Sequence, residues 1–195
     1  MRRTRATVGL VAVALGAAGV AVALAGTGAS SPGRASGPFA WLHPASPPAG
    51  WRAARIAGGA SLAYPPGWTP IKTDPGSASA ALLGSGGAID AYVNATPRQG
   101  AETLGDWSRF RPQHNLHEGD RAVRLVASST HLRFRSGGRG SCVIDDYATT
   151  KATYREIACL VSGAGSSAVV VAAAPTRLWA RHAATLERAV ASFVP

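Results

Sequence analysis

Residues 141–147 read Ser-Cys-Val-Ile-Asp-Asp-Tyr, and residues 154–161 read Tyr-Arg-Glu-Ile-Ala-Cys-Leu-Val. Both stretches are rich in β-branched and aromatic residues, and a short polar segment, residues 148–153, separates them. This pattern is typical of two antiparallel strands joined by a turn. We therefore predict an antiparallel hairpin here, as part of a mainly antiparallel sheet.

One register of this hairpin accounts for several residues at once. If Cys142 stands opposite Cys159, cross-strand pairs also form between Ile144 and Ile157, between Asp146 and Arg155, and between Tyr147 and Tyr154. Each is a favourable combination for directly opposed side chains. A bridge between opposed residues requires a closely spaced, non-hydrogen-bonded pair, and we predict that Cys142 and Cys159 form such a pair.

Cys142 and Cys159 are the only cysteines, and an even count in a chain that meets an oxidising compartment favours a structural disulfide. A reactive thiol would need a neighbouring base, but no His lies within ten residues of either cysteine. A zinc site would need two more ligands at suitable spacing, and none is evident. We therefore predict a disulfide between Cys142 and Cys159, and neither a catalytic nor a metal site at these residues.

The same register sets Asp145 opposite Glu156, a like-charge pair that is normally unfavourable. Arg133 or Arg135 on a neighbouring strand would neutralise it, and this is the preferred interpretation. A bound cation is the alternative.

Further strands and two helices are expected on either side of the hairpin. The unbroken apolar run 168–174 predicts a central strand covered on both faces. A second hairpin is predicted across the Gly-rich turn 84–87, and further strands at 56–64 and 123–135, the latter broken at residues 128–130.

The spacing of apolar residues predicts a helix over 102–110, ending before Pro112, and a final helix capped by Thr176. Trp107 and Trp179 should lie on the buried faces of these helices. The fold class is therefore α+β, a mainly antiparallel sheet with helices packed on it.

The amino-terminal segment has the pattern of an export signal. Arg2, Arg3 and Arg5 precede an apolar stretch, residues 6–25, without a charge. Its length lies between that of a signal peptide and that of a transmembrane helix, and Ala25 closes an acceptable cleavage site. In either case the positive-inside rule places the rest of the chain outside the cytoplasm. We therefore expect an extracytoplasmic protein, secreted or held at the outer face of the cytoplasmic membrane through residues 6–25.

Residues 26–50 are rich in Pro, Gly, Ser and Ala, the composition of a linker, and residues 51–195 form the predicted domain. Phe39, Trp41 and Leu42 interrupt the linker. These three residues would pack back on the domain, lie at the membrane surface or contact a partner, and packing is the preferred alternative.

Composition narrows the range of partners. The net charge is +10, and removing the three arginines of the export signal leaves about +7 on the exported part. The basic residues are dispersed rather than clustered, which excludes a nucleic-acid-binding arm. Attraction to anionic lipid or a cell-wall polymer remains open.

One polar cluster is a candidate for acid–base chemistry or metal binding. It comprises His114, His117, Glu118 and Asp120. The spacing matches no established ligand pattern, and the preferred alternative is a solvated loop between a helix and a strand. The chain also has no nucleophile-elbow motif of the kind found in acyl hydrolases.

Short motifs resemble those of the PsbP-like superfamily, which includes exported actinobacterial LpqN-like proteins of unassigned function. They are the corner Tyr-Pro-Pro-Gly-Trp at 64–68, the closing segment 186–193, and residues 94–100 and 154–159. The resemblance implies an α-β-α sandwich and a role in binding or assembly without catalysis or cofactors. The expected protein is thus a noncatalytic envelope protein that binds another envelope protein, a lipid or a cell-wall component. The alternative is an extracytoplasmic enzyme with a site near His114 and His117.

Overall fold

The computed structural model describes residues 37–195. The predicted export segment 1–25 and the first part of the linker lie outside the described residues. Within residues 37–195, no helix combines the length and the apolar character that a bilayer crossing requires.

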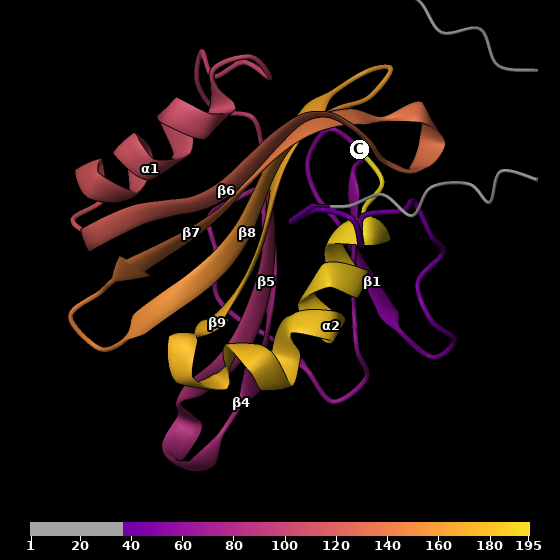
Figure 1. The fold of residues 1–195 in the computed structure, drawn as a ribbon. Helices are drawn as coiled ribbons and strands as arrows, with labels where there is room; N and C mark the ends of the chain where they lie inside the picture. The colour runs from indigo at the N-terminus through magenta and orange to yellow at the C-terminus, as the bar shows by residue number, and fades with distance from the viewer. Residues whose placement is uncertain (1–36) are drawn as a thin grey trace, which may run out of the picture. The chain divides into compact units, whose positions relative to one another are not determined.

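A seven-stranded antiparallel sheet forms the framework (Figure 1). Its strands lie in the order β3-β4-β5-β9-β8-β7-β6. Their bounds are Thr69–Pro70 (β3), Ala78–Leu83 (β4), Ile89–Pro97 (β5), Arg121–Arg133 (β6), Arg139–Ala148 (β7), Thr153–Ser162 (β8) and Ser167–Pro175 (β9). A separate hairpin is made by β1 (Arg52–Arg55) and β2 (Ser61–Tyr64). The prediction of a strand over 56–64 is wrong for the first half of that range. A turn at Gly58 and Gly59, both at positive φ, precedes β2.

The β7–β8 hairpin has the predicted register at every position named from the sequence. Cys142 faces Cys159, Ile144 faces Ile157, Asp146 faces Arg155 and Tyr147 faces Tyr154. The disulfide is present, with the two Cα atoms 4.1 Å apart, a separation typical of a non-hydrogen-bonded pair. The guanidinium of Arg155 donates to Asp146 across the pair at 2.7 Å.

Strand β9 lies between β5 and β8 and is buried along almost its whole length. Its side chains alternate between two hydrophobic cores. Val170 and Ala172 belong to the larger core, and Val169 and Val171 belong to the smaller one. The unbroken apolar run therefore has the predicted cause, since each face of this strand is covered.

Helix α2 (Trp179–Ala191) covers the face of the larger core. Leu186, Val190 and the following Phe193 are fully buried there, while Trp179 is half-buried against the same core. The predicted cap at Thr176 is wrong, because Thr176 begins a single 3-10 turn and Leu178 occupies the position before the helix, without a side-chain cap.

Helix α1 (Trp107–His117) covers the opposite face, as Figure 1 shows. The predicted end before Pro112 is wrong, since the helix continues through Pro112 to His117. An interior proline removes one backbone hydrogen bond and costs about 3 kcal/mol. Contacts of the helix with the sheet at both of its ends, described below, compensate for this loss.

The segment before β1 packs on the domain. Phe39 and Leu42 are buried in the larger core, and Trp41 packs against it. Of the three alternatives for these residues, the structure shows packing.

Strand β6 lies at the far edge of the sheet. It is one strand with three register shifts, so the prediction that it is broken at residues 128–130 is wrong. Leu125 and Val126 on this strand are exposed.

Candidate functional site

Three contacts between residues distant in the sequence hold α1 on the sheet. The indole nitrogen of Trp107 donates to the carbonyl oxygen of Ala158 at 2.9 Å, and Trp107 itself is 1% exposed. The hydroxyl of Ser141 donates to the carbonyl of Leu104 at 2.6 Å, just before the helix. At the other end, the buried Asn115 donates to two acidic side chains of the sheet. The prediction that Trp107 lies on a buried face is confirmed.

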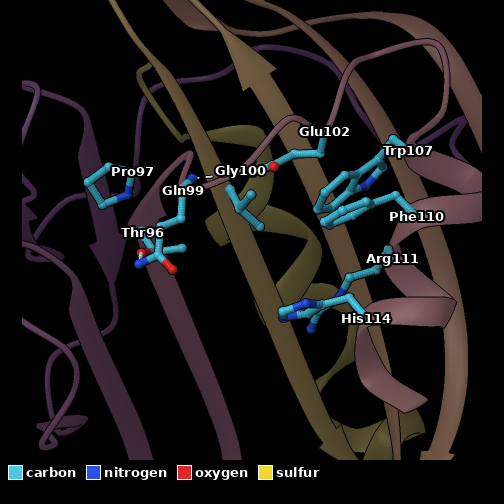
Figure 2. Close-up of a pocket in the computed structure, with 10 residues that line it drawn as sticks. Thr96, Pro97, Gln99, Gly100, Glu102, Trp107, Phe110, Arg111 and His114 are labelled. Carbon is cyan, nitrogen blue, oxygen red and sulfur yellow. Dashed lines mark hydrogen bonds between the residues drawn. The ribbon is translucent and has the colours of Figure 1, made fainter. Parts of the chain in front are cut away.

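The helix covers only part of this face and leaves a groove beside it, which we call the α1 groove. It consists of two adjoining cavities of about 270 and 220 Å³. Both are lined by Thr96, Gln99, Arg111, His114 and Val169. Figure 2 shows the side chains of α1 on one side of the larger cavity and Thr96, Pro97 and Gln99 on the other.

A row of stacked rings forms the helix side of the groove. Trp107 stacks on Phe110 with ring centroids 5.8 Å apart, and Phe110 stacks on His114 at the same distance. These residues share one face of α1 because they are spaced at three and four residues. Together with Pro97 and Val169 they make the larger cavity mainly apolar.

A buried charge cluster lies beneath the helix. Glu156 has no exposed surface, and Arg111 binds it in a bidentate manner, with Nε–Oε1 at 2.7 Å and Nη2–Oε2 at 2.9 Å. Asn115 donates a further hydrogen bond to Glu156 at 3.3 Å. Burial alone would raise the pKa of Glu156, but Arg111 and Asn115 outweigh it and lower that pKa. Glu156 is therefore an ionised partner of Arg111.

Asp145 faces Glu156 across the hairpin and is also fully buried. Asn115 donates to its Oδ2 at 3.4 Å, while its Oδ1 has no hydrogen-bond partner. Burial and the negative charge of Glu156 raise the pKa of Asp145 to about 8. Asp145 is therefore mainly protonated at neutral pH, and the cluster holds one negative and one positive charge.

The predicted neutralisation of this acidic pair by Arg133 or Arg135 is wrong. The cation comes from Arg111 on α1, which lies far from both positions in the sequence. Arg133 instead lies opposite Arg139 at the distant end of β6. The ion pair between Arg111 and Glu156 thus attaches α1 to the sheet and also compensates the negative charge of the like-charge pair.

Two tyrosines extend the buried network toward the groove. The hydroxyl groups of Tyr92 and Tyr147 lie 3.0 Å apart, and burial is the main reason that the pKa of each is raised. Tyr92 also lines the smaller cavity. Both phenols are neutral hydrogen-bonding groups at physiological pH.

Glu102 provides a further acidic group at the larger cavity. The residue is 5% exposed, and its Oε1 accepts a hydrogen bond from the backbone nitrogen of Gln99 at 3.3 Å. Its Oε2 is buried without a partner. Figure 2 shows this carboxylate beside Gly100 at the rim of the aromatic row.

The four residues of the predicted polar cluster have different environments. His114 lines the groove. His117 and Glu118 are exposed at the end of α1, and Asp120 is half-buried at the start of β6. Burial, followed by the charge of Glu156, raises the pKa of Asp120. Within residues 37–195, no group of three or more His, Cys, Asp or Glu side chains is placed to hold a metal ion.

Sequence reasoning missed Arg111, Asn115 and Glu102. The signal for the first two was present, because Trp107, Arg111 and Asn115 recur every four residues and so share one face of a helix. Ending the helix at Pro112 hid this pattern. No sequence signal identifies Glu102, since its role depends on the fold of the loop before α1.

No protein-family model and no curated protein matches this sequence. The fold is similar to that of PsbP from Synechocystis sp. PCC 6803 (CyanoP), at 16% identity and a TM-score of 0.56, over 75% of this chain and 93% of that one. It is also similar to PA94 of Pseudomonas aeruginosa, a protein of unknown function, at 14% identity and a TM-score of 0.50, over 74% and 96% of the two chains. LpqN of Mycobacterium tuberculosis, involved in cell envelope biogenesis, is matched at 10% identity and a TM-score of 0.39, over 74% and 91%. The match to CyanoP shows that the described part of this chain has a PsbP-like fold, as its short motifs predicted.

Proposed function

We propose that this protein is a noncatalytic binding protein of the cell envelope, exported or membrane-anchored, and that the α1 groove is its ligand site. The α1 groove is the main observation in support of this proposal, because an apolar wall and a few converging polar groups line the same cavity. That combination is characteristic of small-molecule sites. Its walls come from α1, the loop before it and the central strands, so they are held by the same contacts that hold the fold.

Two features support a location outside the cytoplasm. The buried Cys142–Cys159 bridge is of the kind that persists in oxidising compartments. The pattern of residues 1–25 is that of an export signal. The ligand would then be a component of the envelope or of the medium.

The hydrogen bonds of the groove residues favour binding over catalysis. Arg111 is held by Glu156, and the hydroxyl of Thr96 accepts from Ser77 at 2.7 Å. Among the side-chain hydrogen bonds within residues 37–195, none joins His114 to a nucleophile. A paired nucleophile and base is the arrangement that covalent catalysis requires.

The test is ligand-induced stabilisation of the purified full-length protein in detergent. Water-soluble and lipid-soluble fractions of an envelope extract would be added, and the melting temperature measured. Gln99→Trp places a large ring at an exposed position of the groove rim, and Thr130→Trp is the matched control on the exposed edge strand β6.

We expect at least one fraction to raise the melting temperature of the wild type and of Thr130→Trp, but not that of Gln99→Trp. An equal response of all three proteins, or of none, would contradict the proposal. Mass spectrometry of the bound compound before and after incubation tests for chemistry. Conversion that is lost in His114→Ala would support the enzyme alternative instead.

A further inference from the structure

The carboxylate of Glu102 has no established role in the fold. Only one of its oxygens is hydrogen-bonded, to the backbone of Gln99, and the other is buried without a partner. A buried polar atom without a partner destabilises the fold, and does so more when it is charged. A donor supplied by a ligand in the adjoining cavity would remove that destabilisation.

The charges around the α1 groove leave an excess of acid. The guanidinium of Arg111 is compensated by its bidentate contact with Glu156. Glu102 lines the larger cavity and Asp74 the smaller one. The three ion pairs within residues 37–195 involve neither of them. The groove is thus an acidic site on a chain whose net charge is +10.

The remaining walls suit an apolar body that carries a positive group. Phe110, Pro97 and Val169 line the same cavity as Glu102. Aromatic faces attract cations and also pack against apolar groups. The cavity volume of about 270 Å³ lies just below the usual range for ligand pockets, about 300–1,000 Å³. It therefore suits a small molecule rather than a polymer.

We propose that the α1 groove binds a small organic amine through its ammonium group. Glu102 Oε2 accepts a hydrogen bond from the ammonium, and the apolar part of the ligand lies along Phe110 and Val169. This inference rests on the proposed function, since it names the class of ligand for the same groove. A cationic ligand is preferred over a hydroxyl compound because the carboxylate charge is otherwise uncompensated.

Three probes of nearly equal shape test the charge preference: 2-phenylethylamine, 2-phenylethanol and 3-phenylpropionate. Binding to the full-length protein in detergent would be measured by titration calorimetry at pH 7. We expect the amine to bind at least tenfold more tightly than the alcohol, and the carboxylate more weakly than either. An alcohol or carboxylate that binds as tightly as the amine would overturn the inference.

Two variants test the role assigned to Glu102. Glu102→Gln keeps the shape and removes the charge, so the affinity for the amine should fall about tenfold while that for the alcohol stays similar. Glu118→Gln, at an exposed position on the end of α1, should bind the amine like the wild type. In Gly100→Ala the new Cβ would lie 2.6 Å from Oε2 and displace the carboxylate, with a loss similar to that of Glu102→Gln. An unchanged affinity in Glu102→Gln would overturn the inference.

The outcomes separate this inference from the proposed function. If the extract stabilises the protein through the groove but the amine does not bind, the inference fails and the proposed function stands. If neither the extract nor any probe gives an effect that Gln99→Trp abolishes, both fail.

Discussion

Asp145 and Glu156 face each other across the β7–β8 hairpin, and both side chains are fully buried. Two carboxylates in such a position cannot both be ionised at low cost. The protein resolves the conflict in two ways. Arg111 compensates the charge of Glu156 through a bidentate contact, and Asp145 retains a proton at neutral pH. Helix α1 is therefore tied to the sheet by charge as well as by apolar packing.

The first prediction concerns pH. The pKa of Asp145 is raised from 3.8 to about 8 in the folded state. Between these values the folded protein binds more protons than the unfolded chain, so the contribution of Asp145 to stability is complete below about pH 4. It is lost as the pH rises toward 8, at a slope of up to about 1.4 kcal/mol per pH unit.

Asp145→Asn keeps the shape and cannot lose a proton. We expect this variant to show a flatter stability profile than the wild type between pH 4 and 8, and to exceed its stability above pH 8. Urea unfolding at a series of pH values measures both profiles. Asp90→Asn is the matched control, because Asp90 is half-buried near the start of β5 and does not face the Asp145–Glu156 pair. A profile of Asp145→Asn parallel to that of the wild type would refute the assignment.

The second prediction concerns the counter-ion. Arg111→Met removes one partner of a buried ion pair and leaves Glu156 uncompensated, a change that typically costs 3–5 kcal/mol. The double variant Arg111→Met/Glu156→Gln should recover part of that loss. Arg124→Gln is the control, because Arg124 is largely exposed where it contacts Asp146, and exposed pairs contribute about 0–1 kcal/mol. Equal losses for the two single variants would show that Arg111 has no special role.

The third prediction concerns the disulfide. Cys142 and Cys159 are 17 residues apart in sequence, and a bridge that closes a loop of this length stabilises by about 3 kcal/mol. The double variant Cys142→Ala/Cys159→Ala should therefore unfold at a lower urea concentration than the wild type. Reduction of the wild type should give a loss of similar size. A loss below about 1 kcal/mol in both experiments would mean that the bridge contributes little to the fold.

The fourth prediction concerns topology. If residues 1–25 export the chain, protease added to intact spheroplasts should digest the domain. An epitope in the exposed edge strand β6 would report its loss on an immunoblot, and a cytoplasmic protein in the same cells should remain intact. Protection of the domain until the spheroplasts are lysed would contradict export.

The hairpin, its register and the disulfide could all be predicted from the order of the residues. Antiparallel strands have a period of two, so Cys142, Ile144 and Asp146 share one face and can meet only one matching set of partners. The central position of β9 could also be predicted from the sequence, because a strand covered on both faces must be apolar throughout. These features depend on local patterns that a linear sequence displays directly.

The length of α1, and the contacts that depend on it, could not be predicted from the sequence because long-range packing sets them. Local propensity predicts that the helix ends before Pro112. However, the contacts of Trp107 and Asn115 hold the two ends of α1 on the sheet, so the helix continues past Pro112. Once the helix continues, Arg111 reaches Glu156 and the groove opens beside Phe110 and His114. The energy of these long-range contacts exceeds the local cost of one proline, and no local pattern records them. The counter-ion of the buried acids and the candidate ligand site therefore became visible only when the chain was folded.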